Sequence, residues 1–69
     1  MISVTVNGEE RRLEDGATVE KLLQSLEVKR RGRGLAVERN REIVPRTTYE
    51  QTPLADGDAI EIVTLVGGG

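Results

Sequence analysis

The chain has 69 residues, with 10 lysines and arginines against 12 aspartates and glutamates, and a net charge of −2 at pH 7. A single small domain of this size buries only roughly 60% of the surface that its unfolded chain exposes. Cysteine and histidine are both absent, which excludes disulfides, thiolate zinc sites and the commonest nucleophile–base pairs. We therefore expect a protein that is not an enzyme by itself and that binds no metal and no cofactor of its own.

The sequence shows no segment typical of export or of membrane insertion. Residues 2–7 are too short and too polar for a signal peptide, and no apolar stretch is long enough to span a bilayer. We expect a cytoplasmic protein that does not associate with membranes.

Residues 1–13 have the pattern of a β-hairpin. Apolar and polar residues alternate from Ile2 to Val6, which is the period of a half-buried strand. Asn7-Gly8 then favours a type I′ turn, because both of its central positions need a positive φ. Residues 9–13 are expected to return as a short antiparallel strand with charged outer positions.

A short amphipathic helix is predicted to follow. Thr18 is a good N-cap, and Glu20 in the first turn suits the positive end of the helix. One face of this helix would carry four apolar residues, namely Val19, Leu22, Leu23 and Leu26. Such a short helix is marginal in isolation, so it must pack against a sheet.

The second half of the chain reads mainly as short extended segments. Residues 35–37 and 43–44 are candidate strands, and Pro45 ends the second of them because it cannot donate to a ladder. Tyr49, the one aromatic residue, is expected to fill part of the core. Residues 56–58 form a turn before the final strand, which starts at Ile60.

This order of elements predicts an α+β fold, in which a mixed sheet of four to five strands packs against one main helix. The first and last strands have the strongest apolar alternation, so we expect them to lie side by side, parallel, in the middle of the sheet. The predicted core draws on most of these segments and consists of Ile2, Val4, Val6, Leu13, Val19, Leu22, Leu23, Leu26, Leu35, Val37, Leu54, Ile60 and Ile62.

The chain ends with Gly67, Gly68 and Gly69. Glycine has no side chain to pack, and three extended residues make a narrow arm that reaches about 10 Å. We expect the terminal carboxylate of Gly69 to be the working group, with Leu65 and Val66 anchoring the root of the arm. The alternative is an ordinary frayed terminus, since chain ends are usually poorly ordered.

The last strand also predicts a docking face. If Ile60 and Ile62 point inward, then Glu61, Val63 and Leu65 point outward. Two apolar residues on an outer face indicate a partner surface, although scattered exposed apolar residues are equally ordinary.

Positive charge is concentrated between residues 29 and 46. The cluster at 29–33 contains one lysine and three arginines and could bind phosphates. However, no aromatic residue is interleaved to stack on bases, and the chain is acidic overall. We expect a solvated loop that binds no nucleic acid and that can steer an acidic partner surface.

Several motifs together resemble the ThiS-like sulfur carrier proteins of thiamine (thiazole) biosynthesis, which belong to the ubiquitin-like β-grasp superfamily. The matching segments cover nearly the whole chain, at residues 6–9, 18–23, 43–46, 54–58 and 60–69. In one departure, these proteins often carry an Asn-Gly turn just before Ile43. The corresponding residues here, 38–42, contain no glycine, which leaves the type of that turn open.

The resemblance implies a β-grasp domain over residues 1–66 and a flexible glycine tail over residues 67–69. It also implies that the Gly69 carboxylate is adenylated by an ATP-dependent adenylyltransferase (E1-like, ThiF-like), because an ionised carboxylate is a poor electrophile. A sulfur donor protein would then supply sulfur for a terminal thiocarboxylate, which a ThiG-like thiazole synthase would use to form the thiazole ring. ATP would be used by the activating partner.

The same resemblance implies that Gly68 belongs to the reactive tail and that partner enzymes bind four neighbouring positions: Val63, Leu65, Val66 and Gly67. Two related functions remain open at this point. The chain could be the small subunit of molybdopterin synthase, or a ubiquitin-like tag that is conjugated to lysines.

Overall fold

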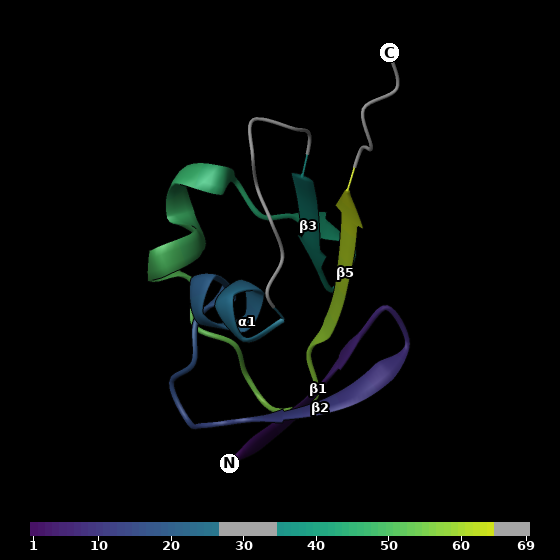
Figure 1. The fold of residues 1–69 in the computed structure, drawn as a ribbon, viewed down its shortest axis with the longest axis vertical. Coiled ribbons are helices and arrows are strands. Elements are labelled where there is room, and N and C mark those ends of the chain that lie inside the picture. Colours follow the sequence, from purple (N-terminus) through teal and green to yellow (C-terminus); the bar gives the residue numbers. More distant parts are fainter. Residues whose placement is uncertain (27–34, 65–69) are drawn as a thin grey trace.

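The computed structural model describes residues 1–26 and 35–64. Within these ranges the order of elements is β1 (Ile2–Val6), β2 (Glu9–Leu13), α1 (Val19–Ser25), β3 (Leu35–Arg39), β4 (Glu42–Ile43), the 3₁₀ helix η1 (Arg46–Gln51) and β5 (Ala59–Thr64). Figure 1 shows α1 and η1 on the same side of the strands, with both chain ends marked.

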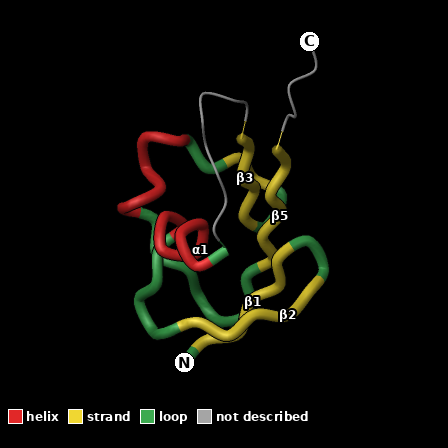
Figure 2. Tube along the Cα trace, in the orientation of Figure 1, coloured by secondary structure: helices red, strands yellow, loops and turns green. Residues whose placement is uncertain are grey.

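The strands of the described residues form a mixed five-stranded sheet in the order β2-β1-β5-β3-β4. β1 and β5 are parallel neighbours, while β2 pairs with β1 and β3 pairs with β5 in antiparallel fashion. Figure 2 shows the same arrangement, with the strands in yellow and α1 in red. The predicted α+β class and the central, parallel placement of the first and last strands are therefore confirmed.

The first hairpin forms as its sequence predicts. Asn7 and Gly8 have φ values of 50° and 86°, both positive as a type I′ turn requires. Val6 and Glu9 pair directly on either side of the turn, so the loop has two residues. The register of β1 and β2 follows from this short turn.

The helix is capped as predicted and is tied to the segment after η1. The Thr18 Oγ1 accepts a hydrogen bond of 3.2 Å from the Lys21 backbone N–H, which satisfies one of the amides left free at the start of a helix. Backbone hydrogen bonds from Val19 to Thr52 and from Leu54 to Ala17 hold the helix start against residues 52–54. Burial of Val19, Leu22 and Leu23 then seats α1 on the sheet.

The core lies between the sheet and the two helices. Its buried side chains are Val4, Val6, Val19, Leu22, Leu23, Val37, Val44, Tyr49, Leu54 and Ile60, and Ile2, Leu13, Leu26, Leu35 and Ile62 pack against them half-buried. The prediction omitted Val44, which is buried although it directly precedes Pro45. Tyr49 is only 2% exposed, so the single aromatic residue is a full member of the core and not a partial one.

Candidate functional site

β5 is the strand that leads to the predicted tail. Its neighbours hold it on both sides, since Thr5 and Val6 of β1 pair with its start and the whole of β3 pairs with it from Ile60 to Thr64. The predictions for Leu65, Val66, Gly67, Gly68 and Gly69 fall outside the described residues and stay predictions. The described part shows that the strand before them is fixed within the sheet.

The described part of β5 alternates as predicted. Ile60 is 1% exposed and Ile62 is half-buried, whereas Glu61 is exposed and Val63 is 50% exposed. Val63, the one predicted partner-binding residue within the described ranges, therefore faces outward.

The register extends this outward face across three strands. Val63 lies opposite Ala36, and Glu61 lies opposite Glu38, which in turn pairs with Ile43 on β4. Because paired residues share a face of the sheet, five side chains form a single surface that we call the outer patch: Ala36, Glu38, Ile43, Glu61 and Val63.

Ile43 lies on the outer patch, although the sequence analysis did not predict it there. Its side chain is 63% exposed, more than that of Val63. The sequence contained one usable signal, because Ile43 and Val44 are neighbours in the strand predicted at 43–44, and successive strand residues point to opposite faces. The outer patch thus combines apolar side chains from three strands with the carboxylates of Glu38 and Glu61.

A polar cluster fastens the start of β5. The Asp58 carboxylate, which is 6% exposed as a residue, accepts hydrogen bonds from the Arg39 Nε (2.8 Å), the Asn40 Nδ2 (3.1 Å) and the Ala55 backbone N–H (2.8 Å). Burial raises the pKa of Asp58, but these hydrogen bonds and the Arg39 charge outweigh it and hold the pKa below its ordinary value. The cluster therefore ties the β3–β4 turn and residue 55 to the start of β5.

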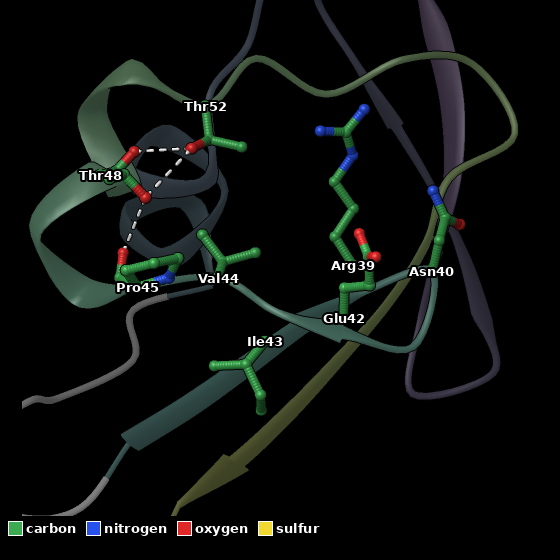
Figure 3. Close-up of a pocket in the computed structure, with 8 residues that line it drawn as sticks. All are labelled: Arg39, Asn40, Glu42, Ile43, Val44, Pro45, Thr48 and Thr52. Atoms are coloured by element: carbon green, nitrogen blue, oxygen red, sulfur yellow. Dashed lines mark hydrogen bonds between the residues drawn. The ribbon is translucent and has the colours of Figure 1, made fainter.

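A hollow of about 330 Å³ lies between the β3–β4 hairpin and η1. It is lined by Arg39, Asn40, Glu42, Ile43, Val44, Pro45, Thr48 and Thr52 (Figure 3). The hydroxyl of Thr48 donates to the Pro45 carbonyl and that of Thr52 to the Thr48 carbonyl. These hydroxyls therefore complete the turns of η1.

The described residues hold no group of three potential metal ligands from histidine, cysteine, aspartate and glutamate. No helix in the same ranges is long and apolar enough to cross a membrane.

The model of the ThiS family matches residues 4–69 of the chain. The chain belongs to the ThiS family. Its backbone is similar to the crystal structure of the thiamine biosynthesis protein ThiS from Geobacter metallireducens, with a TM-score of 0.81 and 33% identity over 99% of this chain and 100% of that one. The predicted relationship to the ThiS-like proteins is thereby confirmed. The predicted β-grasp fold is confirmed as well.

Two relatives of this ThiS-family chain differ in length. It is 42% identical over 55 residues to the sulfur carrier protein ThiS of Bacillus subtilis, covering 80% of each chain. It is 48% identical over 68 residues to a thiazole synthase of Paramagnetospirillum magneticum, covering 99% of this chain and 20% of that protein. The chain thus spans about a fifth of the length of this second relative.

Proposed function

We propose that this ThiS-family chain carries sulfur on the terminal carboxylate of Gly69 for formation of the thiazole ring of thiamine. The observation that supports this most is the family match, which runs through β5 to Gly69. The chain acts as a protein co-substrate, and it needs no cofactor of its own. Because activation consumes ATP, we place the reaction in the cytoplasm.

The proposed chemistry has two steps at the tail. A carboxylate oxygen of Gly69 attacks the α-phosphorus of ATP, the bond to pyrophosphate breaks, and an acyl-adenylate forms. Hydrosulfide, delivered by a sulfur donor protein, then attacks the acyl carbon, and AMP leaves with the bonding electrons while the sulfur loses its proton. The product is a thiocarboxylate. No side chain of the carrier takes part, which agrees with a chain that lacks cysteine and histidine.

Two partner enzymes follow from this chemistry. A ThiF-like adenylyltransferase catalyses the activation and uses the ATP, and a ThiG-like thiazole synthase receives the sulfur. The second partner is supported by the similarity between this chain and part of the Paramagnetospirillum magneticum thiazole synthase. The outer patch supports docking, because its exposed apolar residues Ile43 and Val63 share one face of the sheet and Val63 lies one residue before the end of β5.

An ATP–pyrophosphate exchange assay with the ThiF-like adenylyltransferase of the same organism tests the activation. The full chain is expected to support exchange, Gly69→Ala to slow it, and deletion of Gly68 and Gly69 to abolish it. Normal exchange with the truncated chain would refute the proposal.

Docking through the outer patch is tested with two variants, each of which is first shown to fold. Val63→Asp is expected to slow exchange, because it puts a charge in the apolar part of the contact. Thr5→Asp, at an exposed site on β1, is the matched control and should leave exchange unchanged. If both variants behave like the unmodified chain, docking occurs elsewhere on the molecule.

A further inference from the structure

β2 forms one edge of the sheet, and its outer side pairs with no strand of the described residues (Figure 2). On β1, the backbone N–H groups of Ser3 and Thr5 donate to oxygen atoms of residues 56–58, at 2.8 and 3.0 Å. These groups are therefore directed away from β2, and neither residue exchanges backbone hydrogen bonds with its partner there. The partners are Arg12 and Glu10, so their own N–H and C=O groups point to the free edge.

The side chains of β2 pair one acid with one base on each face of the sheet. Glu10 and Arg12 share the face that carries Ser3 and Thr5. Glu9 and Arg11 share the opposite face. All four charged side chains are exposed, and neither arginine forms an ion pair with a residue of the ranges that the structure describes. Both charges of each face are thus available to a strand that approaches the free edge.

This order of charges is complementary to a second copy of the same strand. If two copies of β2 pair antiparallel about a twofold axis through Arg11, the strands overlap over their full length, 9–13. Glu10 of each copy then lies opposite Arg12 of the other copy. These are the two residues with free backbone groups, so both pairs exchange backbone hydrogen bonds. The opposite charges of each pair attract as well.

The residue on the axis places like charges together, and a neighbouring acid offsets them. Arg11 of each copy faces Arg11 of the other, which by itself costs free energy. Glu9 of the other copy lies diagonally beside it on the same face, within reach of a long side chain. The net charge of each chain is only −2, so general repulsion between the copies is small.

Charges on an edge strand commonly prevent pairing, but here they and the turn select one register. A register centred on Glu10 would place two glutamates opposite each other on the axis. It would also place Arg12 opposite Gly8, whose φ of 86° within the turn does not fit a ladder. That register keeps a single hydrogen-bonded pair of strand residues, whereas the register centred on Arg11 has two.

We propose that two copies of this chain associate through β2 and join their sheets into one continuous sheet. The contact uses one short strand from each copy, so the dimer is weak and exchanges with the monomer. β2 lies at the opposite end of the sheet from β4, and the outer patch on β3, β4 and β5 stays open. Self-association therefore covers an unpaired edge and goes beyond the proposed function without depending on it.

Sedimentation equilibrium of the full chain at concentrations up to about 1 mM measures the association, and amide hydrogen exchange locates it. A dimer is expected, and the N–H groups of Glu10 and Arg12 should exchange more slowly as the protein concentration rises. High salt should weaken the association, because it screens exposed ion pairs.

Charge reversals test the register. Arg12→Glu and Glu10→Arg should each weaken self-association about tenfold, because each places like charges opposite one another twice. An equimolar mixture of these two variants should associate again, since every such pair is then opposite in charge. The double variant, with Glu10→Arg and Arg12→Glu in one chain, should associate like the unmodified chain for the same reason.

Two controls separate the edge contact from folding and from net charge. Glu10 accepts a hydrogen bond of 2.5 Å from the Ser3 hydroxyl within its own chain, so the Tm of each variant is measured first. Glu50→Arg changes the net charge as Glu10→Arg does, at an exposed site on η1. It should leave self-association unchanged.

A chain that stays monomeric at every concentration overturns the inference. Self-association that survives both single reversals, or that does not return in their mixture, also overturns it, because the contact would then lie elsewhere. Slowed amide exchange at residues 10 and 12 only after the thiazole synthase is added overturns it in favour of a strand from that enzyme. The proposed function is tested separately by pyrophosphate exchange, so the two can fail independently.

Discussion

Asn7-Gly8 and Asn40-Arg41 turn the chain at two hairpins of one sheet, and both asparagines reach the same strand. The Asn7 Oδ1 accepts from the Ile62 N–H at 2.8 Å, and its Nδ2 donates to the Ile62 carbonyl at 3.2 Å. Asn40 accepts from Ala59 of that strand in the same way. The two turns therefore hold β5 from opposite sides, one through β1 and one through β3.

The two turns differ at their second position. Gly8 has a φ of 86° and Arg41 has a φ of 72°, but only glycine adopts such values without steric cost. The shared asparagine thus fixes where each hairpin meets β5. The second residue decides whether the turn is relaxed or carries a strained, exposed cation.

The largest effect is expected from loss of the carboxylate that supports the second turn. Asp58→Ala removes the partner of both Arg39 and Asn40 and leaves a partly buried cation unpaired, which should lower the free energy of unfolding by about 3 kcal/mol. Urea denaturation measures this loss. Asp15→Ala is the matched control, because the Asp15 side chain is 80% exposed and pairs with the amino group of Met1. An equal, small effect of both substitutions would contradict the assigned role of Asp58.

The same cluster predicts a pH dependence at the second turn. The folded state lowers the pKa of Asp58 below its ordinary value of 3.8, so the ionised carboxylate stabilises the fold above that pH. This contribution is lost as the pH falls through the lower, folded-state pKa. Denaturation midpoints measured downward from pH 6 should decline in the acid range, and less so in Asp58→Asn. Parallel curves for the two proteins would show that other carboxylates cause the decline.

A smaller effect is expected at the relaxed turn. Gly8→Ala should lower the free energy of unfolding by about 1 to 2 kcal/mol, because alanine pays the left-handed penalty that glycine avoids. A Cβ at this position would meet no atom within 4 Å, so the whole effect comes from the backbone. Urea denaturation is again the measurement, and an unchanged midpoint would mean that the turn relaxes to another type.

The smallest effect has the opposite sign. Arg41→Gly should raise the free energy of unfolding by about 0.5 to 1 kcal/mol, because the relief of strain exceeds the entropy that glycine adds to the unfolded chain. Opposite signs for Gly8→Ala and Arg41→Gly in urea denaturation would establish that the two turns share one backbone geometry. Changes of the same sign in the free energy of unfolding would show that the two turns do not share this geometry.

Much of this fold could be predicted because local and long-range signals agree. Asn7-Gly8 specifies its turn, Thr18 caps its helix, and the alternation of Ile60 and Ile62 with Glu61 sets the inner face of β5. The placement of β1 beside β5 followed from their apolar patterns.

The parts that were missed depend on contacts between distant segments. Nothing near Asp58 in the sequence shows that it accepts hydrogen bonds from Arg39 and Asn40, about 20 residues away. The type of the turn at Asn40-Arg41 was left open by the sequence analysis, because the glycine that usually occupies its second position is absent. The outward orientation of Val63 was predicted from the sequence. The position of Ile43 on the same face of the sheet became clear only from the strand register.

The central claim is that the Gly69 carboxylate becomes a thiocarboxylate. Its most direct test is the intact mass of the purified chain after incubation with ATP, the ThiF-like adenylyltransferase and sulfide, followed by fragmentation. We predict a gain equal to the mass difference between sulfur and oxygen, confined to the C-terminal fragment that contains Gly69. An unchanged mass under conditions in which the adenylyltransferase exchanges pyrophosphate with this chain, or a gain located elsewhere in the chain, would contradict the account.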